Sequence, residues 1–297
     1  MKIGFYCFTG TGNTRRVCET LAEELRARGR ETEINLIHYG NLLHYPEEYD
    51  ALVFAFPVHA FNAPSAMLDF LKALPQNGGA EKSVWLVRVS GEPVGLNHAS
   101  GILPKRILKR RGYTVKGECP YVMPYNIIFR HSNGMAARMW RAMRLLAQKH
   151  ADMICENTGV LYKNGPFRRA VSFALRIEHT AMPIMGKTFK AGKECVGCGA
   201  CEKLCPRGNI SVRGGKVHFS DACVGCMACA FGCPHDAIRI SLLNGWRVNG
   251  AYTFKEQPAS DDEVCNYCKK AYLRYFHEAE GETAENEIYS FNKTPVS

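Results

Sequence analysis

Eight cysteines between Cys195 and Pro234 constrain this chain more than any other feature. The motif Cys-x2-Cys-x2-Cys-x3-Cys-Pro occurs twice, first from Cys195 to Pro206 and again from Cys223 to Pro234. Three cysteines three residues apart can wrap three irons of a cubane [4Fe–4S] cluster, while the following helical turn carries the fourth cysteine to a neighbouring cluster. The repeat therefore predicts two [4Fe–4S] clusters with crossed ligation.

Crossed ligation assigns four cysteines to each cluster. We expect one cluster on Cys195, Cys198, Cys201 and Cys233, and the other on Cys205, Cys223, Cys226 and Cys229. A zinc site is less favoured, because it uses one or two Cys-x2-Cys pairs rather than a run of four closed by proline. A disulfide framework suits a secreted chain, whereas Met1–Tyr6 has the pattern of a strand and not of a signal peptide.

At these residues the sequence resembles the bacterial two-[4Fe–4S] ferredoxins. The resemblance covers roughly Lys187 to Ser241 and includes all eight predicted ligands. It implies a small α+β ferredoxin domain, which we place at residues 187–245.

A second motif lies near the N-terminus, where an apolar strand over Lys2–Tyr6 enters a loop rich in glycine and threonine. A helix from about Thr14 to Arg28 follows, and a strand, a glycine-rich loop and a helix N-terminus together form an anion site. The loop has neither the Gly-Lys-Ser/Thr of a Walker motif nor the third glycine of the dinucleotide fingerprint. Neutral donors alone point to a monophosphate such as FMN, bound by Thr9, Gly10, Thr11, Gly12, Asn13 and Thr14.

This loop resembles the FMN-phosphate loop of flavodoxins, Thr/Ser-x-Thr-Gly-x-Thr, and the resemblance covers about residues 1–125. It implies strand order 2-1-3-4-5, with FMN beyond the carboxyl ends of the strands. His59 and Phe61 would then stack on or edge the flavin ring, although Phe61 packing against Pro64 is the alternative. Arg15 would partly neutralise the phosphate. The expected flavin contacts outside the phosphate loop are Pro57, Val58, His59, Ala60, Phe61, Asn62, Ser90 and Gly91.

Strands and helices alternate through the first 125 residues, which predicts a doubly wound parallel sheet. Further strands are expected at 31–37, 50–56, 83–89 and 113–119, with helices at 66–73 and 100–111.

Residues 126–186 fit neither module and predict a helical connector. One helix, from about Met135 to Glu156, places Arg138, Arg141 and Arg144 on one face. Such a face can dock a partner or a membrane, or it can simply be solvated. A second helix is expected after the turn Asn164-Gly-Pro166 and runs to about Ala181.

Residues 246–297 form a C-terminal extension. The capping box Ser260-Asp-Asp-Glu263 predicts the start of a helix that carries Cys265 and Cys268 on one face, where core packing is favoured over metal binding. The polar tail from Gly281 is expected to be disordered.

The composition favours a cytoplasmic protein without a transmembrane segment, since no apolar run approaches the ~18 residues that cross a bilayer. The formal charge of +10 favours acidic partners. Two clusters would remove about four charges, which makes a nucleic-acid partner less compelling.

The two motifs together resemble proteins of anaerobes that fuse a flavodoxin-like domain to a two-[4Fe–4S] ferredoxin. The resemblance implies an electron carrier that relays electrons between two clusters and FMN, to or from a redox protein donor and acceptor. An FMN-dependent reductase of a small acceptor such as a quinone, fed through the clusters, is the alternative, so an enzymatic role stays open. An iron–sulfur sensor or nucleic-acid module is least favoured, because no DNA-binding motif is present. The oligomeric state is not predicted.

Overall fold

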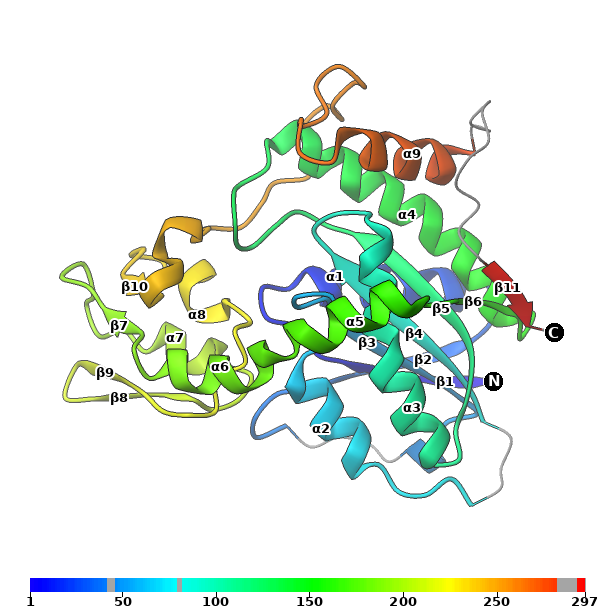
Figure 1. Cartoon of the computed structure of the whole chain (residues 1–297), viewed down its shortest axis with the longest axis horizontal. Helices are drawn as coiled ribbons and strands as arrows, with labels where there is room; N and C mark the ends of the chain where they lie inside the picture. Colours follow the sequence, from blue (N-terminus) through cyan, green and yellow to red (C-terminus); the bar gives the residue numbers. More distant parts are fainter. Residues whose placement is uncertain (42–45, 79–81, 282–292, 297) are drawn as a thin grey trace.

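The computed structural model describes residues 1–41, 46–78, 82–281 and 293–296. Its N-terminal half contains a sheet of five parallel strands in the order β2-β1-β3-β4-β5 (Figure 1). This is the doubly wound, flavodoxin-like order that the sequence predicts. The strands are β1 (Lys2–Cys7), β2 (Glu31–Leu36), β3 (Ala51–Pro57), β4 (Ser83–Ser90) and β5 (Thr114–Val122).

Both faces of the sheet are buried. Successive side chains of a strand point to opposite faces, and in β1 and β3 apolar side chains lie on both faces. Phe5 and Val53 face α1 (Asn13–Ala27) and α4 (Asn133–Cys155). Tyr6 and Phe54 face α2 (Ser65–Ala73) and α3 (Ile102–Arg110). Two short 3-10 helices, η1 (Pro46–Glu48) and η2 (Gly95–Gly101), lie in the connections.

The segment 126–186 is not a uniform connector. Helix α4 packs against one face of the sheet through Met143, Ala147 and Ile154. After β6 (Gly159–Tyr162), helices α5 (Pro166–Leu175) and α6 (Ile177–Gly186) run toward the cysteine-rich region (Figure 1). The single predicted second helix is therefore two helices, divided at Arg176.

The cysteine-rich region is a small α+β unit. Strand β7 (Lys190–Ala191) pairs antiparallel with β10 (Ile238–Arg239), and β8 (Ile210–Arg213) pairs antiparallel with β9 (Lys216–Phe219). Two short helices, α7 (Ala200–Leu204) and α8 (Ala228–Phe231), lie between them.

The C-terminal extension corrects two predictions. The capping box forms, since the backbone N–H of Ser260 donates to Glu263 Oε2 at 2.7 Å. However, α9 (Lys269–Glu280) begins only after Cys268, so Cys265 and Cys268 lie before the helix and not on it. Disorder from Gly281 onward is also wrong in part, because β11 (Lys293–Val296) pairs with β6. Residues 282–292 lie outside the described part of the chain.

The predicted exposed face of three arginines is wrong for Arg138. Its side chain is only 7% exposed, pairs with Asp261 at 2.7 Å and donates to the carbonyl of Ala259 at 3.2 Å. The extension covers this part of α4, where α9 packs, while Arg141 and Arg144 stay exposed. No helix within the described residues has the length and apolar character that a membrane span requires.

Candidate cofactor sites

The structure arranges the eight cysteines of the repeat around two small cavities. The fourth cysteine of each motif lies with the first three of the other motif, as crossed ligation predicts. Four thiols surround each cavity, and no three potential ligands in the described residues converge on a single-ion site. The distal cavity, as we call it, is lined by Cys195, Cys198, Cys201 and Cys233; the proximal cavity is lined by Cys205, Cys223, Cys226 and Cys229.

The chemistry of these sulfur donors suits iron. Burial, together with the neighbouring thiols Cys223 and Cys205, raises the pKa of Cys226 to about 12. Burial also raises the pKa of Cys223 and Cys229. A buried group of thiols with raised pKa values needs cationic charge to become thiolate, and a four-iron cluster supplies that charge.

Backbone amides hold the fourth cysteine of each motif in the same way. The N–H of Asn209 donates to Cys205 Sγ at 3.2 Å, and the N–H of Ala237 donates to Cys233 Sγ at 3.3 Å. Hydrogen bonds to ligand sulfur orient the ligand and tune the potential of a cluster.

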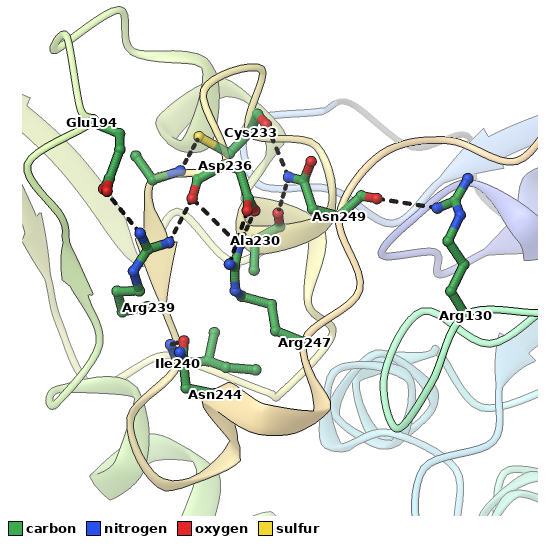
Figure 2. Close-up of polar contacts among 11 residues, drawn as sticks. Arg130, Glu194, Ala230, Cys233, Asp236, Arg239, Ile240, Asn244, Arg247 and Asn249 are labelled. Atoms are coloured by element: carbon green, nitrogen blue, oxygen red, sulfur yellow. Dashed lines mark hydrogen bonds and ion pairs between the residues drawn. The ribbon is translucent and has the colours of Figure 1, made fainter.

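The turn after Cys233 is tied to the C-terminal extension (Figure 2). Arg247 Nη2 donates to Asp236 Oδ2 at 2.9 Å. The side-chain amide of Asn249 donates to the carbonyl oxygens of Ala230, at 2.8 Å, and Cys233, at 2.9 Å. The extension therefore holds the last cysteine in place.

The two cavities differ in their surroundings. The loop around the proximal cavity packs on the flavodoxin-like domain. Its residue Val224 is 7% exposed and lies in the core cluster around Tyr6 and Phe54. In the distal cavity Cys198 is exposed. The proximal side is thus the inner side of the cysteine-rich region.

A larger cavity of about 450 Å³ lies at the carboxyl ends of the strands. Binding sites of this size hold cofactors and drug-sized ligands. Of the predicted FMN contacts, the structure brings twelve together in its wall: Thr9, Gly10, Thr11, Asn13, Thr14, Pro57, Val58, His59, Ala60, Phe61, Ser90 and Gly91.

Two predicted contacts lie outside this wall. Gly12 has a φ of 93°, and its N–H donates to Thr9 Oγ1 at 3.2 Å, so it shapes the loop from within. The side chain of Asn62 is turned to α5, where its Oδ1 accepts from Ser172 Oγ at 2.7 Å. Asn62 therefore anchors the connector.

The N-terminus of α1 suits an anion. Its N-cap Gly12 provides no side-chain cap, so the first N–H groups of the helix remain open to a phosphate. The role expected of Arg15 is not supported, because Arg15 is paired with Glu19 at 2.6 Å and its side chain is 55% exposed. Arg16 is the arginine beside the loop, with Nη1 3.0 Å from the position of a Cβ added at Gly12.

His59 and Phe61 both lie on the rim of this cavity. Ala60 and Phe61 adopt φ values of 42° and 60° in a two-residue turn, closed by hydrogen bonds between His59 and Asn62 of 2.9 and 2.7 Å. His59 Nδ1 lies 3.5 Å from Glu178 Oε1, which comes from α6. Stacking of His59 or Phe61 on a flavin stays a prediction.

Several lining residues escaped the sequence analysis. Strand β5 runs to Val122 rather than Cys119, so the loop that follows it reaches the cavity. The sequence pattern predicts the end of this strand at residue 119. A strand end at Val122 would have identified the following loop as part of the cavity, because ligands bind at the carboxyl ends of the strands. Val89, Glu92 and Asn97 flank the predicted contacts Ser90 and Gly91, and Gly225 and Cys226 belong to the second cysteine motif. The rest come from segments distant in the sequence. The missed residues are Val89, Glu92, Asn97, Met123, Pro124, Tyr125, Asn126, Ile127, Ile128, Glu178, Met182, Gly225, Cys226, Met227, Leu243, Trp246 and Tyr267.

A comparison with known protein families agrees with the cysteine-rich region. Residues 217–239 match the family model of the 4Fe-4S binding domain. The chain combines a flavodoxin-like domain with a 4Fe–4S ferredoxin region. This combination supports a redox role in electron transfer.

Three solved structures illustrate the similarity, each covering 52% of this chain. The Streptococcus pneumonia TIGR4 flavodoxin is 17% identical, covered over 99% of its length, with a TM-score of 0.39. Flavodoxin 1 from Bacillus cereus is 14% identical, 98% covered, with a TM-score of 0.40. The NAD(P)H:quinone oxidoreductase from Methanothermobacter marburgensis is 12% identical, 96% covered, with a TM-score of 0.37. No curated protein matches the chain.

Proposed function

We propose that this protein is an electron-transfer protein that relays electrons between two [4Fe–4S] clusters and FMN, to or from partner redox enzymes. One contact carries the proposal. A Cβ added at Gly10 would overlap the backbone carbonyl oxygen of Cys226, so the anion loop and the proximal cysteine loop touch. Cys226 also lines both the proximal cavity and the 450 Å³ cavity, which gives the two proposed cofactor sites a common wall.

The chain's own residues bind and position the cofactors in this proposal. The two sets of four cysteines hold the clusters, and the loop from Thr9 to Thr14 with the N-terminus of α1 holds the FMN phosphate. When bound, the clusters supply one-electron chemistry and FMN supplies two-electron chemistry. Met182, Trp246 and Tyr267 line the larger cavity from the connector and the extension.

Exposure gives the proposed relay a direction. Cys198 of the distal set is exposed, and Val196 beside it is 64% exposed, whereas Val224 of the proximal motif is buried. A partner redox protein therefore meets the distal end first, and the proximal set stands between that end and the larger cavity.

A second candidate is reduction of a small acceptor such as a quinone. It is favoured by a smaller cavity of about 100 Å³ that shares Val58, Ser90, Glu92 and Asn97 with the larger one. Arg88 lines it and is 2% exposed, and its guanidinium, paired with Glu118 at 3.7 Å, gives the wall a polar group for an acceptor with carbonyl oxygens. Steady-state turnover with a soluble quinone would favour this candidate over a carrier.

An anaerobic spectroelectrochemical titration of the holoprotein tests the main proposal. We expect two cluster transitions and one flavin transition, with about eight irons and eight sulfides for each FMN. A protein that binds a single cluster, or FAD in place of FMN, would contradict it. NADH and NADPH alone should leave the flavin oxidised, because the anion loop lacks the third glycine of the dinucleotide fingerprint.

A further inference from the structure

Helices α5 and α6 carry a row of large apolar side chains that the described residues leave uncovered. Phe167, Phe173, Ile177 and Ile184 are 71%, 72%, 71% and 65% exposed. We call these four residues the α5–α6 ridge. Single exposed apolar residues are ordinary on a protein surface, whereas a continuous row marks a surface that meets a protein or a membrane.

The ridge runs along both helices. Ile177 and Ile184 are seven residues apart on α6 and so share a face. Phe173 lies four residues before Ile177 on α5 and continues this face, because Arg176 between the helices keeps a helical backbone. Phe167 lies six residues before Phe173, about a third of a turn around α5. Phe167 and Ile184 are 17 residues apart, so at a helical rise of 1.5 Å per residue the ridge extends over about 25 Å.

The opposite face of these helices is fixed to the molecule. Ser172 binds Asn62, and His179 Nε2 lies 3.1 Å from the carbonyl oxygen of Ala63. Further along, a Cβ added at Gly186 would overlap Cys223, and one added at Gly225 would lie 2.6 Å from the sulfur of Met182. The ridge therefore stands on a rigid base, from the parallel sheet to the cysteine-rich region (Figure 1).

The stretch of chain that carries the ridge is strongly basic, and of its lysines Lys187 is paired with Asp221 at 3.5 Å. Between residues 157 and 193 the only acidic residue is Glu178, whose carboxylate faces His59 and the larger cavity. The guanidinium of Arg176 lies 5.6 Å from the ring centroid of Phe173. Burial and the nearby charge of Arg106 lower the pKa of Arg176, which places a further cation close by. The basic residues of this stretch are Lys163, Arg168, Arg169, Arg176, Lys187, Lys190 and Lys193.

These features favour one kind of partner. A second copy of the chain would bring two basic borders together, and like charges oppose such contact. A protein partner would need a groove about 25 Å long to accept the projecting side chains. An anionic lipid bilayer has fluid acyl chains for the apolar row and phosphates for the basic border.

We propose that the α5–α6 ridge docks the protein on the surface of an anionic membrane. The four apolar side chains enter the boundary between headgroups and acyl chains, and the flanking arginines and lysines bind lipid phosphates. The helices lie in the plane of the surface and do not cross the bilayer. This inference does not depend on the proposed electron relay.

Vesicle sedimentation of the holoprotein tests the proposal. We expect it to sediment with vesicles of phosphatidylcholine and phosphatidylglycerol mixed equally, to sediment weakly with phosphatidylcholine alone, and to be released by salt. Phe173→Ser combined with Ile177→Ser should weaken binding by about tenfold or more, because each buried methylene contributes to the partition. Arg168→Gln combined with Arg169→Gln should weaken it by roughly tenfold or more.

Matched variants outside the ridge serve as controls. Arg141→Gln with Arg144→Gln removes the same charge from the exposed face of α4. Leu242→Ser removes an apolar side chain that is 91% exposed on η3 (Ser241–Trp246). Both should keep parent binding, and unchanged visible absorption should show that every variant is folded and loaded.

Three results would overturn the proposal. The first is absence of sedimentation with the anionic vesicles. The second is parent-like binding by the Phe173→Ser, Ile177→Ser variant. The third is a dimer, or a complex with an acidic protein probe, that this variant abolishes while the parent ignores vesicles; the ridge would then belong to a protein interface.

Discussion

The two cysteine motifs have nearly the same sequence and very different surroundings. They read Cys-Val-Gly-Cys-Gly-Ala-Cys from Cys195 and Cys-Val-Gly-Cys-Met-Ala-Cys from Cys223. The valine of the first, Val196, is 64% exposed, whereas the valine of the second, Val224, is 7% exposed in the core of the flavodoxin-like domain. The motif specifies how the chain wraps a cluster, and the docking partner decides which copy faces inward.

Within these seven residues the two motifs differ at one position, which is Gly199 in the first and Met227 in the second. Gly199 and Met227 both have positive φ, of 76° and 59°. A non-glycine residue in this region costs roughly 1–3 kcal/mol. The cost is offset by packing, because the side chain of Met227 is 5% exposed and lines both the proximal cavity and the larger one.

Replacing the fourth cysteine of either motif should distinguish the two clusters with the largest effect. Cys205→Ser should destroy the cluster of Cys223, Cys226 and Cys229, with loss of about four of eight irons. Cys233→Ser should instead damage the distal cluster. Iron analysis and low-temperature electron paramagnetic resonance of the two variants would distinguish the clusters. Loss of the distal signal in Cys205→Ser would refute crossed ligation.

The buried valine should matter more than its exposed counterpart. Val224→Ala removes two methyl groups from a packed core and should lower the free energy of unfolding by about 2 kcal/mol. Val196→Ala should change it by less than about 0.5 kcal/mol, as is usual at exposed sites. Urea unfolding followed by tryptophan fluorescence measures both. Equal effects would mean that the two regions do not dock as described.

A methyl group added at Gly10 should push the anion loop and the proximal cysteine loop apart. Gly10→Ala would force Cys226 and Gly10 apart, because a backbone carbonyl cannot move aside as a side chain can. We expect FMN affinity to fall by about tenfold, or 1.4 kcal/mol. Gly165→Ala is the control, since a Cβ there meets nothing within 4 Å. Parent-like flavin binding by Gly10→Ala, measured by fluorescence titration, would argue against a shared wall.

The smallest effect concerns Glu92, which lines both the larger and the smaller cavity and is 9% exposed. Burial raises the pKa of Glu92 above its ordinary value. Its stabilising contribution is therefore present at acid pH and is lost as pH rises through the raised folded-state pKa. Glu92→Gln should flatten this decline, seen as a higher melting temperature than the parent above neutral pH. If the melting temperatures of the two proteins change with pH in the same way, Glu92 is solvated in the folded protein and the prediction is wrong.

Much of the fold was accessible from local pattern. The alternation of apolar strands with amphipathic helices predicts the five-stranded sheet, because each strand must bury both faces. The spacing of the cysteines predicts the two groups of four, because three ligands in one turn leave the fourth to reach away. The loop from Thr9 to Thr14 predicts an anion site at the start of α1, because its glycines and hydroxyls leave backbone donors open.

Only the tertiary structure decided which surfaces are covered. Arg138 looked exposed from its place on α4, yet the extension buries it through Asp261 and Ala259. Arg16 faces the anion loop and its guanidinium lies 5.6 Å from the ring centroid of Phe254 in the extension, whereas Arg15 pairs with Glu19. Val196 and Val224 have the same local sequence and opposite exposure. Periodicity and spacing act over a few residues, whereas burial depends on segments more than a hundred residues apart in the chain, and those meet only when the whole molecule folds.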